Sequence, residues 1–243
     1  MSSPVRAHVE ALLRARKLDV TLTPAGASAP GLRVVSTGLP ALDDRIGGGW
    51  PLGETSEIIG PPSSGRTAVL CASLAAATQR GELAALVDTG DTFDPPTAAA
   101  AAVDLDRLLW ARGDAGDPHG PRAIDRAIKA FGLVLDAGGF GLIALDLGGV
   151  PPPALARLPF TTWRRLQRFV EGREAIALVL AQTPIARSAR GLTVRLEANA
   201  GETPVWRGTS ARSRRLEGLR LSPTVAAART LGGMQNSECR MQK

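Results

Sequence analysis

The chain has 243 residues, enough for one large domain with short appendages at roughly 150 residues per domain. Apolar residues make up 44% and charged residues 21%, values close to those of ordinary globular proteins, which excludes a wholly disordered or fibrous chain. No apolar stretch approaches the roughly 20 residues of a membrane-spanning helix, and two cysteines and two histidines are too few for a disulfide framework or a structural zinc site. A net charge of +6 and a pI near 10.5 favour an anionic partner, most simply nucleic acid. We therefore expect a cytoplasmic protein with no membrane segment and no metal site.

Residues 1–17 have the pattern of a short amphipathic helix. Ser3 and Pro4 suit an N-cap and a first helical turn, and four apolar residues then recur at helical spacing: Val5, Val9, Leu12 and Leu13. Residues 18–33 are rich in Pro, Gly, Ala and Ser without a sustained period, which predicts a linker. The apolar stripe is the candidate partner-binding surface, and the linker is long enough to let the helix dock on another subunit.

From residue 34 onward, short apolar runs alternate with longer alanine- and leucine-rich segments. The apolar runs are TSEIIG, ELAALVD, FGLIALD, AIALVLAQ and LTVRLEA, and the helical segments include RTAVLCASLAAATQR, PRAIDRAIKAFGLVLDA and TTWRRLQRFVEG. This alternation predicts βαβ units, and so an α/β fold with a mainly parallel sheet flanked by helices. We expect this core to span residues 34–206. Residues 207–243 are rich in Arg, Ser, Gly and Thr, which predicts a basic, partly disordered carboxy-terminal extension with one strand at LEGLRLS.

A glycine-rich segment, running from Gly60 to Thr67 as GPPSSGRT, lies between a predicted strand and a predicted helix. Its spacing matches the phosphate-binding motif GxxxxGK[ST], except that Arg66 stands at the lysine position. In such a loop, backbone N–H groups and the helix N-terminus bind phosphate oxygens, and a hydroxyl, here that of Thr67, ligates magnesium. The run FGLIALD ends at Asp146, which would bring a carboxylate to the same edge of the sheet. Taken alone, such a motif is equally typical of a plain strand-to-helix turn.

Two longer segments resemble the RecA recombinase family. Residues 34–67, VVSTGLPALDDRIGGGWPLGETSEIIGPPSSGRT, are similar to the RecA segment that leads into its phosphate loop, and residues 87–110, VDTGDTFDPPTAAAAAVDLDRLLW, are similar to the strand and helix that follow. The resemblance implies that Asp146 is the Walker B aspartate and that Gln182 is the glutamine that senses nucleotide. The nucleotide-binding residues that it implies are Gly60, Ser63, Ser64, Gly65, Arg66, Thr67, Asp94, Asp146 and Gln182.

The chain departs from the RecA pattern at three places. The wide guanidinium of Arg66 does not reproduce a compact ammonium between the β- and γ-phosphates. Gly90 stands where the family has the glutamate that activates water, and Asp91 is one residue late. The adenine-stacking tyrosine falls at Thr97, which leaves Asp94 without its aromatic neighbour. We therefore expect no catalytic residue and no required cofactor, with weak binding of ATP and Mg²⁺ at most.

The DNA-binding loops of the family are short in this chain, but arginines remain near them and in the extension. Only 36 residues separate Asp146 from Gln182, so the first loop is a proline-rich remnant, GGVPPPALARLPF, and the second is TPIARSARG. Arginines spaced by Ser, Thr and Gly neutralise phosphates without reading sequence. A merely solvated basic tail is the alternative. The candidate DNA-binding residues are Arg187, Arg190, Arg207, Arg212, Arg214 and Arg215.

The short length, the tethered helix and the altered loop are most similar to the ImuA group of RecA-like accessory proteins. That resemblance implies a non-enzymatic role in the DNA damage (SOS) response, in which the protein supports mutagenic translesion synthesis. The implied partners are RecA, an ImuB-like inactive polymerase, DNA or several of these. Homo-oligomers are a further option. One alternative is a DNA-dependent ATPase of the recombinase family that tolerates arginine in the phosphate loop. A SulA-like cell-division inhibitor is a third and less favoured interpretation.

Overall fold

The structure of the protein is a computed structural model, and it describes residues 33–113, 116–186, 188 and 190–196 with their side chains. Three further strands, within residues 204–228, are described as backbone only. The chain divides into two units, Met1–Arg33 and Val34–Lys243, and the second carries everything described below. None of the helices in the described part of the chain is long and apolar enough to span a membrane.

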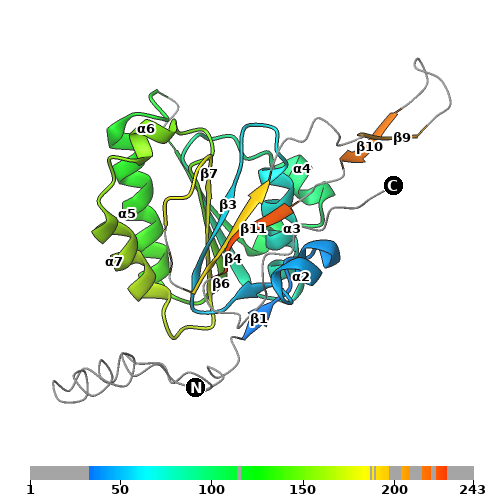
Figure 1. Cartoon of the computed structure of the whole chain (residues 1–243), viewed down its shortest axis with the longest axis horizontal. Coiled ribbons are helices and arrows are strands. Elements are labelled where there is room, and N and C mark those ends of the chain that lie inside the picture. The colour runs from blue at the N-terminus through cyan, green and yellow to red at the C-terminus, as the bar shows by residue number, and fades with distance from the viewer. Residues whose placement is uncertain are drawn as a thin grey trace, which may run out of the picture. The chain divides into compact units, whose positions relative to one another are not determined.

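A seven-stranded sheet forms the centre of the second unit (Figure 1). Its strand order is β11-β8-β3-β7-β6-β4-β5, in which six neighbouring strands run parallel and β11 runs antiparallel to β8 at one edge. The strands are β3 (Thr55–Ile59), β4 (Leu83–Asp88), β5 (Leu108–Arg112), β6 (Phe140–Asp146), β7 (Ile176–Ala181), β8 (Leu192–Leu196) and β11 (Pro223–Ala228). The α/β fold with a mainly parallel sheet that the sequence predicts is therefore confirmed.

Helices cover both faces of this sheet, with α5, α6 and α7 on one side and α2 and α3 on the other (Figure 1). The helices are α2 (Pro40–Ile46), α3 (Arg66–Gln79), α4 (Pro95–Ala100), the 3-10 turn η2 (Leu105–Arg107), α5 (Pro121–Ala137), α6 (Pro152–Leu155) and α7 (Phe160–Val170). Two small antiparallel pairs complete the fold: β1 (Val34–Val35) with β2 (Trp50–Pro51), and β9 (Pro204–Arg207) with β10 (Arg215–Leu219).

Alternate side chains of each central strand enter two separate hydrophobic cores. In β6, Leu142 and Ala144 pack with α3, whereas Ile143 and Leu145 pack with α5 and α7. Because successive side chains of a strand point to opposite faces, a strand buried on both faces reads as the continuous apolar run seen in the sequence. Full burial of each such side chain stabilises the fold by about 1.5–3 kcal/mol. The two cores together hold the strand ends, and the loops that follow them, in fixed positions.

The sheet extends into the region that the sequence assigns to the carboxy-terminal extension. Strand β11 lies beyond residue 206, where we placed the end of the core, and it pairs with β8 along its whole length, from Pro223 opposite Leu196 to Ala228 opposite Leu192. The run PTVAAA has little of the β-branched or aromatic character that marks a strand, so only the backbone pairing identifies it. Strand β10 corresponds to the strand predicted at LEGLRLS.

Candidate functional site

The loop after β3 has the backbone geometry of a phosphate loop. Gly65 adopts a φ of 90° and is the N-cap of α3, a left-handed conformation that glycine takes at little cost. Ser63 also has a positive φ, 62°, and the N–H of Ser64 donates to the carbonyl oxygen of Pro61 at 3.3 Å. The first N–H groups of α3 have no acceptor within the helix and carry the positive end of its dipole. This end of α3 is suited to an anion, and Thr67 lies exposed in its first turn.

Two aspartates end neighbouring strands at the same edge of the sheet. Asp88 of β4 and Asp146 of β6 are direct register partners. Asp88 is buried and accepts hydrogen bonds from the backbone N–H of Phe93 at 2.8 Å and from the indole N–H of Trp110 at 3.3 Å. Asp146 accepts from the backbone N–H of Gly148 at 2.7 Å. Burial raises the pKa of Asp146 above its usual value, and the hydrogen bond from Gly148 opposes this in part.

The loop after β6 brings three of the sequence-predicted residues together at Gly148. The guanidinium Nη2 of Arg66 donates to the Gly148 carbonyl oxygen at 3.1 Å, and the side-chain amide of Gln182 donates to the same oxygen at 3.3 Å. A Cβ at Gly148 would lie 2.9 Å from Arg66 Nη1 and 2.9 Å from Asp146 Oδ1, so any side chain there would have to displace these two groups from their present positions. Gly148 is thus required for this contact, although no motif in the sequence identified it.

The Arg66 side chain is half-buried, and its Nη1 atom has no hydrogen-bond partner in the described part of the chain. Burial lowers the pKa of this guanidinium, and the nearby charge of Asp146 opposes that shift. A buried donor without an acceptor is costly, by about 1–3 kcal/mol. The Arg66 guanidinium therefore lies near Asp146, and its Nη1 donor is unpaired there.

The segment after β4 holds Asp91 away from the phosphate loop. Asp91 has a φ of 52° and accepts two hydrogen bonds from the Arg112 guanidinium, both at 2.8 Å. Arg112 also lies over the Trp110 ring, 4.7 Å from its centre. The hydrogen bond from Arg112 lowers the pKa of Asp91. At Gly90, an added Cβ would lie 3.2 Å from Thr92 Cγ2 and 3.8 Å from His119 Cε1, so a side chain at this position would require the Thr92 side chain to shift by a few tenths of an ångström.

Asp94 acts as the N-cap of the next helix. Its Oδ2 atom accepts from the backbone N–H of Thr97 at 3.0 Å and from the hydroxyl of the same residue. An aspartate at this position satisfies one of the free N–H groups of α4. The two residues that match the family's adenine-contacting positions therefore bind each other at the surface of the molecule.

The second predicted loop runs back along the strand direction, from the carboxyl end of β7 to the amino end of β8. Gln182 follows β7 at the edge that carries the phosphate loop, whereas Gly191 contacts Thr55 at the start of β3, at the opposite edge. The carboxyl group of Glu57 fixes this connection, because its Oε1 accepts from the backbone N–H groups of Ile185 and Ala186, both at 2.6 Å. Its Oε2 accepts from the hydroxyl of Thr193 at 3.1 Å, which ties the same carboxyl group to β8.

Candidate DNA-binding residues lie away from the phosphate loop where the structure describes them. Arg190 is exposed at the far edge of the sheet, where its charge acts on Glu54. Arg207 and Arg215 stand opposite each other in the β9–β10 pair, with only their backbone described. The other predictions of DNA or partner binding lie outside the described residues: Val5, Val9, Leu12, Leu13, Arg187, Arg212 and Arg214.

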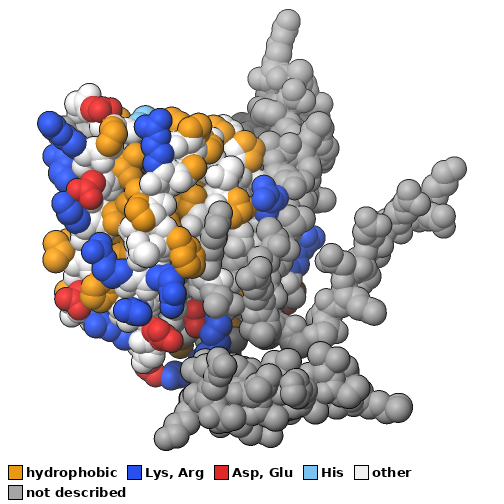
Figure 2. All heavy atoms as spheres, turned by 60° about the vertical axis from the view of Figure 1, so that its left-hand side comes forward, with side chains coloured by type: hydrophobic (Ala, Val, Ile, Leu, Met, Phe, Trp, Pro, Cys, Tyr) orange, Lys and Arg blue, Asp and Glu red, His pale blue; other side chains and the backbone are white. Residues whose placement is uncertain are grey.

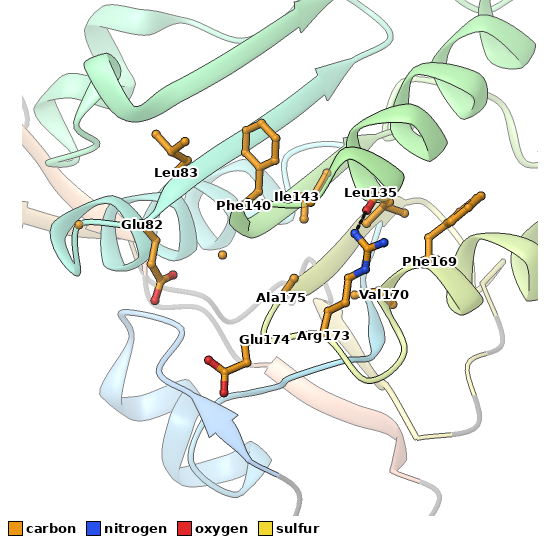
Figure 3. A pocket seen from close by; sticks show the side chains of 14 residues that line it. Glu82, Leu83, Leu135, Phe140, Ile143, Phe169, Val170, Arg173, Glu174 and Ala175 are labelled. Carbon is orange, nitrogen blue, oxygen red and sulfur yellow. Dashed lines mark hydrogen bonds between the residues drawn. The ribbon is translucent and has the colours of Figure 1, made fainter.

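A hollow of about 620 Å³ lies at the edge of the sheet where β4, β6 and β7 begin, far from the phosphate loop (Figure 3). Arg173 reaches across it and donates to the carbonyl oxygens of Leu135 at 2.7 Å and Asp136 at 3.2 Å. These are carbonyls of the last turn of α5, which attract a cation. The guanidinium thus serves to cap α5, and the sequence-predicted residues all lie elsewhere.

The architecture and the phosphate loop together define a RecA-like α/β protein. The profile of the RecA N-terminal domain family matches residues 21–148, and the chain belongs to that family. Protein RecA of Streptococcus pyogenes is 37% identical over 116 residues, which are 47% of this chain and 29% of that protein, and Protein RecA of Streptococcus uberis is 36% identical over 116 residues and 28% of its length. The similarity thus spans less than a third of these relatives. The crystal structure of the RadB recombinase has the same fold, with a TM-score of 0.53 at 16% identity, over 81% of this chain and 97% of that chain.

The residues at the phosphate loop fit a nucleotide with its magnesium ion only in part. The free N–H groups of α3 suit phosphate oxygens, and Thr67 and Asp146 are the oxygen ligands that would hold the ion. Bound magnesium would neutralise charge on the phosphates. Arg66 fits less well, because its side chain already bonds to Gly148 and a phosphate would have to replace that carbonyl as its acceptor.

Proposed function

We propose that this chain is a RecA-like accessory protein of the ImuA type, which acts in the DNA damage (SOS) response without hydrolysing ATP. In this role it supports mutagenic translesion synthesis through contacts with RecA, an ImuB-like protein and DNA. Membership of the RecA N-terminal domain family supports the recombination and repair setting. The placement of the Arg66 guanidinium on Gly148 is the observation that carries the non-enzymatic part of the proposal.

Phosphoryl transfer depends almost entirely on positioning and on electrostatic stabilisation of the transferred group. Three parts that would supply this are altered. The loop cation bonds to a backbone carbonyl, Gly90 carries no carboxyl group to orient water, and Asp94 is bonded to Thr97 where an aromatic ring would stack on adenine. Loss of all three leaves little stabilisation of a transition state.

The alternative function is a DNA-dependent ATPase of the recombinase family. The phosphate-loop backbone, Asp146 and the Gln182 contact favour it, since these are the parts that such an enzyme would use. It would also need a base, from Asp91 or from a partner protein. Arg112 weighs against Asp91 in that role, because two hydrogen bonds and a lowered pKa both make this carboxylate a poorer proton acceptor.

The proposed partners can be tested with the full chain. We expect the purified protein to bind immobilised RecA and an ImuB-like protein from the same source. Deletion of residues 1–20 should weaken at least one of these interactions or change the oligomeric state measured by light scattering, because it removes the apolar stripe of Val5, Val9, Leu12 and Leu13. If the full chain bound neither protein, the accessory role would be wrong. If the truncated chain behaved like the full one, residues 1–20 would have only a local role.

A further inference from the structure

The side of the molecule formed by α6 and α7 is positively charged. Residues 147–170 contain four arginines and no acidic residue. All four are exposed: Arg157, Arg164, Arg165 and Arg168. Figure 2 shows this side, with Lys and Arg side chains spread among hydrophobic ones. A surface of this kind attracts anionic groups and raises the rate of encounter with an acidic partner.

An apolar groove lies next to these arginines, between the start of α7 and the segment after β7. Its volume is about 320 Å³, within the range of small binding pockets, roughly 300–1,000 Å³. Phe160 at its rim is 50% exposed, an unusual state for so large an apolar side chain. Its lining side chains are apolar except for one hydroxyl, and polar backbone atoms also reach its surface. The lining residues are Pro152, Leu155, Ala156, Leu158, Phe160, Trp163, Thr183, Pro184 and Ile185.

The groove and the charges are held rigidly by the same helix. Phe160, Arg164 and Arg168 follow one another at intervals of four residues and so share one stripe of α7. The adjoining stripe is buried, with Trp163 and Leu166 in the core. On the other wall, Glu57 fixes the segment at 185–186 through two hydrogen bonds. A preformed surface loses little conformational entropy when a partner binds.

We propose that this α6–α7 surface is a docking site for an acidic segment of a partner protein, in which one large apolar side chain enters the groove. The acidic residues of the segment would lie along Arg164 and Arg168, and the apolar side chain would pack against Phe160. This assignment stands on the α6–α7 surface alone and is independent of the proposed function.

Charge and side-chain polarity favour an acidic peptide over the other candidate occupants. Residues 1–17 of this chain include four basic residues and one acidic residue, so the arginines would repel them. Single-stranded nucleic acid would satisfy the arginines and could stack a base on Phe160, but the other groove side chains offer the polar edges of a base only the Thr183 hydroxyl. An acidic peptide with an apolar anchor satisfies both parts.

The experiment is selection of peptides from a random phage-displayed library on the full chain, followed by binding titrations with the selected synthetic peptides. We expect the selected peptides to carry net negative charge and one Leu, Phe or Trp. Their affinity should fall at least tenfold for the Arg164→Glu/Arg165→Glu variant and for Ala156→Trp, which fills the groove. A control variant with the same change of charge elsewhere, Arg80→Glu/Arg107→Glu, should bind as the natural chain does.

Four results would overturn the proposal. The first is failure to enrich any peptide, or enrichment of peptides without net negative charge. The second is equal binding by the natural chain and Arg164→Glu/Arg165→Glu, with both shown to be folded by circular dichroism. The third is displacement of the bound peptide by a single-stranded oligonucleotide whose own binding is lost in Ala156→Trp, which would assign the groove to nucleic acid. A partner that is a second copy of this chain would appear as dimerisation lost in the same variants, and would also contradict the proposal.

Discussion

The guanidinium of Arg66 donates to the carbonyl oxygen of Gly148, 82 residues further along the chain, across 3.1 Å. This bond joins the first turn of α3 to the loop after β6, and Gln182 reaches the same oxygen from the end of β7. A phosphate group in the loop would compete for the Arg66 donors. A phosphate bound in the loop would therefore weaken the Arg66–Gly148 hydrogen bond. Through this bond, nucleotide binding would change the position of residues 147–159.

The first prediction separates nucleotide binding from hydrolysis. Arg66→Lys removes the bond to Gly148 and provides a compact ammonium, so nucleotide affinity measured by calorimetry should rise. Hydrolysis should not appear, because Gly90 still offers no carboxyl group. A general base contributes roughly 10²- to 10⁴-fold to such a reaction. The double variant Arg66→Lys/Gly90→Glu should therefore release phosphate above background, with the flexible Thr92 side chain moving slightly to admit the new Cβ.

The matched control for this series is Gly90→Glu alone, which restores the carboxyl group and leaves Arg66 on Gly148. We expect this single variant to bind nucleotide as weakly as the natural chain and to release no phosphate. Hydrolysis by Arg66→Lys alone would show that the arginine was the only obstacle to catalysis, and the argument from Gly90 would then be wrong.

The second prediction concerns pH. Burial raises the pKa of Asp146, so the folded protein favours the protonated carboxyl group more than the unfolded chain does. The cost of the buried charge is fully present above the folded-state pKa, and stability rises as pH falls through that value toward the usual 3.8. Asp146→Asn should therefore be more stable than the natural chain at neutral pH. Each kcal/mol of added unfolding free energy should raise the melting temperature by about 2–4 °C. The difference should vanish in acid, where Asp146 is itself protonated.

Thermal unfolding followed by circular dichroism at several pH values measures this difference. Since Asn can still accept the hydrogen bond from Gly148, the comparison isolates the charge. A variant less stable than the natural chain at neutral pH would mean that attraction to Arg66 outweighs the cost of burial.

The third prediction concerns Glu57, which is 2% exposed and accepts three hydrogen bonds from segments more than 125 residues away. Glu57→Ala would leave one buried and two partly buried donors without this partner, and each fully buried unpaired donor costs about 1–3 kcal/mol. We expect a loss of roughly 3 kcal/mol or more in urea unfolding, and a smaller loss for Glu57→Gln, whose amide oxygen can still accept from Ile185 and Ala186. As a control, Glu82→Ala, at a half-buried surface ion pair with Arg80, should change stability by less than about 1 kcal/mol.

Elements with a strong local pattern could be predicted from the sequence. The apolar runs around β3, β4, β6, β7 and β8 and the periodic segments of α3, α5 and α7 all lie where the pattern places them. The phosphate loop followed from its glycines, and Asp146 from its place at the end of a buried strand. These features depend on neighbouring residues, so short-range rules suffice.

Features that depend on distant residues could not be predicted. The contact of Arg66 with Gly148 is decided by a side-chain conformation, and the role of Glu57 by a loop 128 residues away. Strand β11 forms because β8 offers an unpaired edge, not because PTVAAA favours a strand. The pairing of Asp91 with Arg112 likewise required the register of β4 with β5.

The fourth prediction concerns the basic extension. Arg212, Arg214 and Arg215 lie within the run SARSRR, and each phosphate that they neutralise adds about 0.9 to the slope of log affinity against log salt on duplex DNA. Their replacement by alanine should reduce that slope by up to about three, with little effect on sequence preference. Fluorescence anisotropy at several salt concentrations measures the slope. An unchanged slope, equal to that of Arg80→Ala/Arg107→Ala, would show that the extension does not contact phosphates.

Phosphate release by the natural chain, with and without single-stranded DNA and beside RecA as the active control, tests the central claim most directly. We expect no release above background in either condition, because the loop cation is bonded to Gly148, Gly90 has no carboxyl group and Asp91 is paired with Arg112. DNA-stimulated release that is abolished by Asp146→Ala would contradict the accessory role and establish the ATPase alternative.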